Sequence, residues 1–158
     1  MDDEAPRWLD DDEMAAWRAV VSVLIRLPGA LDAQLRRDAG LTHFDYQVLA
    51  MLSDGPDRRR RMSELARSTD ASLSRLSHAV ARLEERGWVA RTVDPDDGRA
   101  TVAALTDAGV AKLEASAPGH AAAVRRHVFD PLTTRQVADL RRIAERLGAT
   151  LEDRADGR

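Results

Sequence analysis

Small polar and basic side chains recur between residues 72 and 82 in a pattern suited to hydrogen bonding with nucleic acid. The apolar residues here fall at helical spacing, which predicts a buried face of Leu73, Leu76, Val80 and Leu83. Arginine can bond both major-groove acceptors of guanine, and serine can bond a base or a phosphate. We therefore expect DNA contacts, rather than mere solvent exposure, from the side chains on the other faces: Ser72, Ser74, Arg75, Ser77, His78 and Arg82.

The neighbouring segments predict the elements that would position these side chains. Residues 62–68 read as a short helix, and Thr69-Asp70 as a turn that supplies the N-cap oxygen of a helix from about Ala71 to Arg86. Gly87 suits a left-handed C-terminal position. Two β-rich segments follow, residues 88–93 and 100–105, joined by a turn. The order is a helix-turn-helix followed by a β-hairpin wing.

The predicted wing carries basic and acidic side chains near its tip. Arg91 and Arg99 could contact DNA, because an arginine at a wing tip can enter the negative minor groove. Asp94, Asp96 and Asp97 would repel phosphate. In the alternative interpretation Asp97 pairs with Arg99 and fixes the turn, so that Arg99 is structural. Both interpretations remain open.

Basic residues are concentrated in the middle of the chain. Residues 58–93 hold nine arginines and four acidic residues, although the formal net charge of the whole chain is -3. Residues 1–14 are strongly acidic. The run Arg58 to Arg61 is either a solvated loop or a loop facing phosphates, and Arg59 is our candidate phosphate contact.

Helical patterns flank this central segment. Asp10 and Thr42 are predicted N-caps, Pro28-Gly29 a bend or break, and Gly40 a helix end. A capping pattern at Thr133 precedes an apolar seam of Val137, Leu140, Ala144, Leu147 and Leu151. We expect a mainly α fold with a small β-wing, divided into an N-terminal dimerisation region (1–41), a winged helix-turn-helix (42–106) and C-terminal dimerisation helices (107–158).

Several classes of function lack a signature in this sequence. The chain has no Cys, which excludes disulfides and Cys-ligated zinc. His120 and His127 are seven residues apart, whereas metal ligands on one helix usually lie three or four apart. No catalytic constellation is present, so we expect neither an enzyme nor a cofactor. No signal peptide and no uninterrupted apolar run of about 20 residues is found. A cytoplasmic protein without a membrane partner is expected.

The chain resembles the MarR family of winged-helix regulators over nearly its whole length. The resemblance rests on S-R-L-S-H-A-V-A-R-L-E-E-R-G-W-V (residues 74–89) and D-D-G-R-A-T-V-A-A-L-T-D-A-G (residues 96–109). It implies a homodimer whose two recognition helices enter successive major grooves of pseudo-palindromic double-stranded DNA. Gly98 departs from the family pattern, in which many members have Arg or Lys at this place. A minor-groove contact there cannot be carried over.

The resemblance also implies a response to a small aromatic acid or phenolic compound. The pocket would lie between the dimer helices and the winged helix, within reach of Trp17, Arg18, His43, Tyr46 and Arg91. Trp17 also suits packing at the dimer interface, which is the favoured alternative. The predicted function is a DNA-binding transcriptional regulator, a repressor released by such a ligand. The alternative is a winged-helix module that binds protein and no longer binds DNA.

Overall fold

The computed structural model describes residues 6–94 and 97–155, with side chains described as far as residue 151. The chain forms two compact units, residues 1–119 and 120–158. Each unit is described by itself below. The division into three functional regions remains a prediction.

The first unit begins with a long helix, α1 (Asp11–Ala39), as the capping residues predicted. The Asp10 carboxylate accepts a hydrogen bond from the Glu13 backbone N–H, and the Glu13 side chain accepts one from the Asp10 N–H. Gly40 ends the helix at a φ of 63°, where a side chain would be strained. Pro28 lies inside the helix, so residues 11–39 form one helix rather than two.

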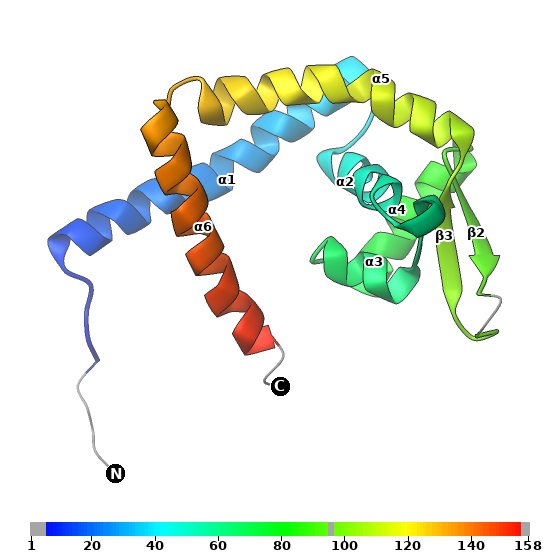
Figure 1. Cartoon of the computed structure of the whole chain (residues 1–158), viewed down its shortest axis with the longest axis horizontal. Coiled ribbons are helices and arrows are strands. Elements are labelled where there is room, and N and C mark those ends of the chain that lie inside the picture. The colour runs from blue at the N-terminus through cyan, green and yellow to red at the C-terminus, as the bar shows by residue number, and fades with distance from the viewer. Residues whose placement is uncertain (1–5, 95–96, 156–158) are drawn as a thin grey trace, which may run out of the picture. The chain divides into compact units, whose positions relative to one another are not determined.

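The winged helix follows α1 and contains most of the core (Figure 1). It consists of α2 (His43–Ser53), a 3-10 turn η1 (Pro56–Arg58), a short strand, α3 (Met62–Ser68) and α4 (Leu73–Glu85), followed by two further strands. Thr42 caps α2 together with Asp45, as predicted. The core side chains with no exposed surface include Leu49 on α2, Leu65 on α3 and Leu76 on α4. These contacts fix α4 against α2 and α3.

The sheet has three antiparallel strands in the order β1-β3-β2. The predicted hairpin is present as β2 (Val89–Val93) and β3 (Thr101–Leu105). The third strand, β1 (Arg59–Arg61), corrects our expectation of a loop, because Arg61 pairs with Val102 and Arg59 with Ala104 of β3. Three consecutive arginines give no alternation of apolar and polar residues, so no strand pattern was visible. Strand β3 of the wing is therefore hydrogen-bonded to β2 on one side and to β1 on the other.

Two predictions about α4 were wrong. The N-cap oxygen comes from Ser72 rather than from Thr69 or Asp70, and the helix begins at Leu73. Leu73 does not belong to the buried face, since it remains 55% exposed. Leu73 is the first helical residue, directly after the cap. The buried face of α4 is instead Leu76, Ala79, Val80 and Leu83.

Helix α5 (Asp107–Val124) begins after Thr106, whose hydroxyl accepts a hydrogen bond from the Gly109 N–H. It continues through Pro118 into a π-helical turn, η2 (Arg125–Phe129). The second unit is completed by α6 (Thr134–Ala155). The predicted cap of α6 is present, because Thr133 and Gln136 exchange hydrogen bonds between side chain and backbone. Helix α6 exposes Leu140, Leu147 and Leu151 of its predicted apolar seam, and Ile143, which the seam did not include, is exposed as well.

Helix α1 leaves its N-terminal two thirds without cover. No residue from 11 to 30 is buried, and five large apolar side chains are exposed: Trp17, Val20, Val23, Leu24 and Ile25. Among the described residues α1 alone is long and apolar enough to cross a membrane, with a mean hydropathy of 1.4 over 18 residues. The test averages hydropathy over a window, so it accepts a helix whose apolar residues are interrupted by charges such as Arg18. An apolar helix face that packs on another protein chain passes the same test.

Candidate nucleic-acid interface

The N-terminal half of α4 presents the predicted DNA-contacting side chains to solvent. Ser74, Ser77 and His78 are all exposed, as are the other three candidates on this helix. The Ser72 hydroxyl has a second role, since it accepts a hydrogen bond of 3.2 Å from the Arg75 N–H. Ser72 therefore begins the helix that carries the remaining candidates. The structure brings the six residues onto one helix and its cap.

Arg75 lies against α2. Its guanidinium carbon is 4.2 Å from the centre of the Phe44 ring, a distance typical of a cation–π contact. Phe44 is itself buried and belongs to the core. Sequence reasoning missed this contact, since the two residues are far apart along the chain. The ring holds the arginine at the surface of α4 without neutralising its charge.

Arg82 is paired more strongly than the sequence suggested. Its Nη2 lies 2.8 Å from Oδ1 of Asp45, and the Asp45 side chain is only 8% exposed. The other oxygen of Asp45 accepts a hydrogen bond from the Thr42 N–H. This carboxylate thus joins the start of α2 to the middle of α4. Arg82 therefore has a positioning role within the protein, whether or not it also reaches DNA.

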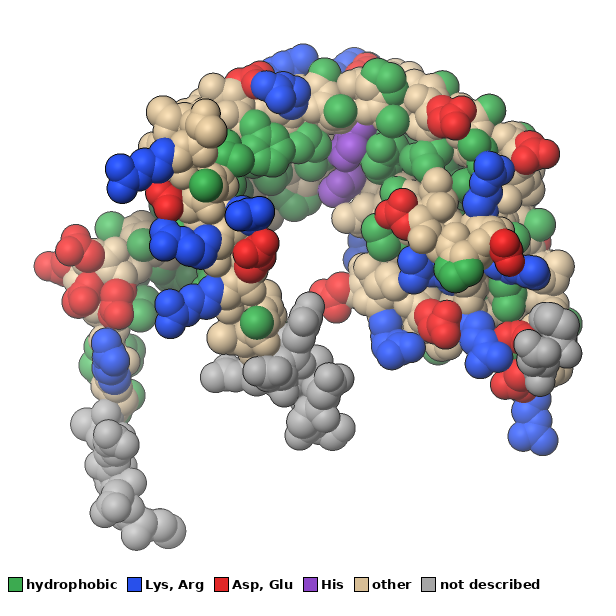
Figure 2. All heavy atoms as spheres, viewed as in Figure 1, with side chains coloured by type: hydrophobic (Ala, Val, Ile, Leu, Met, Phe, Trp, Pro, Cys, Tyr) green, Lys and Arg blue, Asp and Glu red, His purple; other side chains and the backbone are tan. Residues whose placement is uncertain are grey.

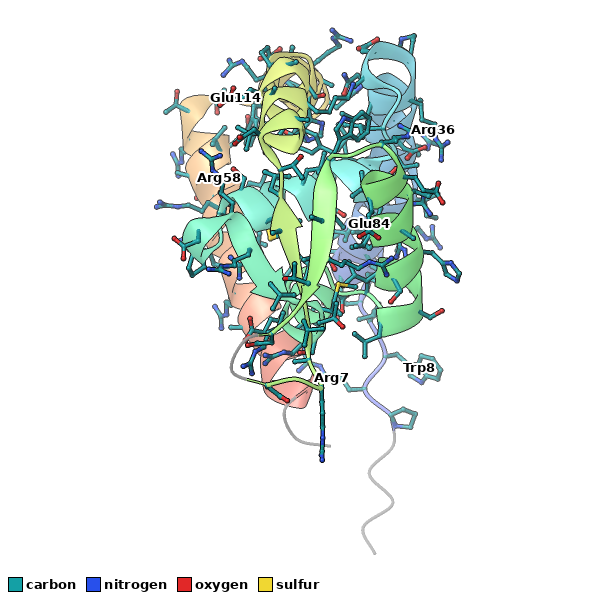
Figure 3. All side chains as sticks on the ribbon, turned by 90° about the vertical axis from the view of Figure 1, so that its right-hand side faces the viewer. Arg7, Trp8, Arg36, Arg58, Glu84 and Glu114 are labelled. Atoms are coloured by element: carbon teal, nitrogen blue, oxygen red, sulfur yellow. The ribbon has the colours of Figure 1, made fainter. Side chains whose placement is uncertain are left out.

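Arg91 is likewise held by an acidic neighbour. Its Nε and Nη2 donate to Oε2 of Glu84, and its backbone N–H donates to Oε1. The Arg91 hydrogen bonds lower the pKa of the Glu84 carboxyl. Figure 3 labels Glu84 on α4, beside the strands. The pair connects α4 to strand β2.

At the turn end of the wing, Arg61 rather than Arg99 forms the ion pair with an acidic side chain. Asp94 is buried, and its Oδ2 accepts a hydrogen bond of 2.6 Å from Nε of Arg61, whose pKa the pairing raises. Asp97 accepts a hydrogen bond from the Arg99 backbone N–H at 3.1 Å. Within residues 6–94 and 97–151, no ion pair joins the Arg99 guanidinium to an acidic group. Asp96, predicted to repel phosphate, lies outside the described residues.

The arginine run on β1 is partly neutralised by neighbouring groups. Arg58 lies 3.6 Å from Asp107, and Arg59 lies 3.8 Å from Asp57. Arg60 donates to the Met51 carbonyl. The Arg59 side chain remains about half exposed, so it stays available to a phosphate. Figure 2 shows basic and acidic side chains alternating along the lower edge of the winged helix.

A cleft of about 600 Å³ lies within the first unit, between α1, α2 and α4. Of the five residues predicted to reach a ligand, His43 lines the cleft, whereas the other four do not: Trp17, Arg18, Tyr46 and Arg91. Burial lowers the pKa of His43. Asp32 lies beside it, accepting hydrogen bonds from the His43 N–H and Arg36 Nε, and Arg36 lowers the Asp32 pKa. Arg75, His78 and Arg82 line the same cleft from α4.

The described residues include no group of three or more His, Asp or Glu side chains arranged to hold a metal ion. The polar groups of α4 and the wing are therefore donors and acceptors on an open surface. Such an arrangement suits recognition of a polyanion by hydrogen bonds and charge.

Comparisons with known proteins agree with this geometry. The chain is similar to Sco3205, a MarR family transcriptional regulator from Streptomyces coelicolor whose crystal structure is a complex with DNA, with 46% identity, 92% coverage of both chains and a TM-score of 0.88. It is 33% identical to the HTH-type transcriptional repressor Rv2887 of Mycobacterium tuberculosis over 70% of this chain and 77% of that relative. It is also 33% identical to YxaD of Bacillus subtilis, an uncharacterized HTH-type transcriptional regulator, over 60% of this chain.

The match to YxaD spans 65% of that relative's length. A sequence model of the MarR family matches residues 39–100, which cover the end of α1, the helix-turn-helix and both sides of the wing turn. These relatives are transcriptional regulators rather than enzymes, as the sequence predicted. The fold, the position of the exposed helix α4 and the likeness over the full winged helix place the chain in the MarR family of transcriptional regulators.

Proposed function

We propose that this protein is a sequence-specific DNA-binding regulator that represses transcription in the cytoplasm. The observation that carries the proposal is the exposed polar face of α4, where Ser74, Arg75, Ser77 and His78 are open to solvent on a helix fixed by its buried face. Docking a recognition helix by its N-terminal residues places such side chains at base edges. The crystal structure of Sco3205, a relative 46% identical to this chain, in complex with DNA supports DNA binding by this protein.

The proposed active form is a homodimer on a pseudo-palindromic site. Support comes from two exposed apolar surfaces, one on α1 around Leu24 and one on α6 around Leu147, which are 62% and 54% exposed. Contiguous apolar surfaces of this kind mark protein interfaces. A second copy of the chain is the proposed cover for these surfaces, and a two-fold symmetric dimer would also present two copies of α4 to DNA.

The cleft beside α4 is the proposed site of a small effector, an aromatic acid or phenol. Arginine and histidine side chains line it, and Phe44 supplies an aromatic surface. A carboxylate or phenolate there would meet Arg75 and His78, which we also propose as DNA contacts. An occupied cleft would therefore compete with the operator for Arg75, which supports release of DNA on binding.

Fluorescence anisotropy with labelled duplexes tests the proposal. The duplexes are the DNA upstream of the protein's own gene and a shuffled duplex of equal length and composition. We expect tighter binding to the upstream duplex, with a steep dependence on salt. Equal, weak binding to both duplexes would contradict specific recognition and favour a winged-helix module that binds protein instead.

A further inference from the structure

Leu73 is an exposed apolar side chain at the point where α4 would enter DNA. It is the first residue of α4 and directly follows the cap Ser72. Within residues 42–94 and 97–106, only Leu73 and Val93 are large apolar side chains with more than half of their surface exposed, at 55% and 64%.

The surroundings of Leu73 are polar and basic. One groove of about 520 Å³ runs along its side facing α3 and contains Ser63 and Arg67. A second groove of about 360 Å³ runs between α4 and the wing and contains Ser77, Arg91 and Arg99. Leu73 and Ser63 line both grooves, and Leu73 is the apolar part of the ridge between them. The ridge is thus an apolar point flanked by hydrogen-bond donors.

A thymine methyl group is the apolar feature that the DNA major groove offers to such a ridge. The hydroxyls of Ser74 and Ser77 lie one and four residues further along α4, so they follow Leu73 into the groove on the proposed docking. We propose that Leu73 is a specificity residue that reads the 5-methyl group of one thymine in each half-site. This inference rests on the proposed DNA-binding function and adds a base preference to it.

The test begins with duplexes that the wild-type protein selects from a library with a randomised centre. The tightest duplex is then remade with each thymine in turn replaced by uracil, which keeps the base pairing and removes only the methyl group. We expect one thymine per half-site at which uracil weakens wild-type binding about fourfold, the effect of burying one methyl group. Leu73→Ala should bind the thymine and uracil duplexes with equal affinity.

Leu73→Met is the matched control, because it keeps an apolar side chain of similar size and should retain discrimination against uracil. Leu73 is largely exposed, so both variants should melt at the wild-type temperature, which circular dichroism checks. Full discrimination against uracil by Leu73→Ala would overturn the inference, and so would a wild-type protein indifferent to uracil at every position. A wild-type protein that selects no duplex would instead refute the proposed DNA binding, and the inference would fall with it.

Discussion

The guanidinium group of Arg75 rests on the Phe44 ring, with 4.2 Å between the guanidinium carbon and the ring centre. The first residue belongs to the helix proposed to read DNA, and the second to α2 and the hydrophobic core. Both line the same cleft. The contact connects the proposed effector site and the proposed reading surface through one side chain.

Arg75→Ala should weaken binding to the selected operator by about 1–3 kcal/mol while changing binding to random DNA little, because a base contact carries discrimination. Arg59→Ala is the matched control on β1. It should weaken binding to both duplexes similarly, since a phosphate contact carries no sequence information. Anisotropy titrations at one fixed salt concentration measure both. Equal losses on the two duplexes for Arg75→Ala would remove Arg75 from the set of base contacts.

Arg82→Ala should lower the free energy of unfolding by about 1–3 kcal/mol, because it leaves the nearly buried Asp45 carboxylate without its arginine. The control is Arg142→Ala on α6, which breaks a pair of the same atoms at 2.7 Å between exposed side chains and should cost less than about 1 kcal/mol. Urea unfolding of both variants at equal protein concentration gives the comparison. Equal costs would show that the Asp45 pair contributes no more than a surface pair.

Substitutions at Asp97 separate its hydrogen bond from its charge. Asp97→Ala removes the acceptor of the Arg99 N–H, so the turn should loosen and DNA affinity should fall despite the loss of a negative charge. Asp97→Asn keeps an acceptor oxygen without the charge, and it should bind DNA more tightly than the wild type at low salt. Affinities at two salt concentrations distinguish the two effects. Tighter binding by both variants would show that the hydrogen bond does not matter for DNA binding.

Binding of an aromatic carboxylate to the cleft should strengthen as the pH falls from 7 towards 5. Burial lowers the pKa of His43, so its imidazole is neutral at pH 7, and an anion nearby favours the protonated form. The titration uses benzoate and a His78→Gln background, which removes the other imidazole of the cleft. His43→Gln in that background should abolish the pH dependence. If benzoate binding still strengthens at lower pH in the double variant, the group that titrates is neither His43 nor His78.

The same shift has a consequence for stability. The pKa of His43 is lower in the folded protein than its ordinary value of 6.5, so below that value the unfolded chain binds the proton more readily. The free energy of unfolding should therefore decrease as the pH falls through 6.5. Ligand titrations should be accompanied by a check of folding at each pH.

Leu147→Glu on α6 should disrupt the homodimer, because a charge would have to be buried where two apolar surfaces meet. Light scattering at micromolar concentration should give the mass of a dimer for the wild type and of a monomer or unfolded chain for the variant. Glu145→Leu, on the same helix, does not introduce such a charge and should leave the wild-type dimer intact. A wild-type protein that is a stable, folded monomer would contradict the dimer.

Local signals in the sequence were sufficient for most of the fold. The caps at Asp10, Thr42 and Thr133 and the left-handed glycines Gly40 and Gly87 each depend on neighbours within four residues. These positions were predicted correctly. The N-cap of α4 was missed because Thr69, Asp70 and Ser72 all carry suitable oxygens; in the structure the Thr69 hydroxyl donates to the Leu65 carbonyl of α3, and Ser72 is the cap.

The partners of the site residues were harder to predict, because they come from distant parts of the chain. Arg82 pairs with Asp45, which lies 37 positions away in the sequence, and Arg61 pairs with Asp94, which lies 33 positions away. Strand β1 likewise depends on β3, some 40 residues later. Helical periodicity identified the polar face of α4 but not where its apolar face ends, so Leu73 was assigned to the core. Whether Leu73 is exposed depends on which residues of other elements pack against it, and the periodicity of α4 alone does not show this.

Helix α1 has no buried residue between positions 11 and 30. On the proposed dimer the missing cover comes from a second copy, so each chain completes its core only after meeting another. While chains are scarce, the number of assembled regulators grows with the square of their concentration. Halving the gene dosage would then remove more than half of the active protein, and repression would set in over a narrower range of expression than a monomer could produce.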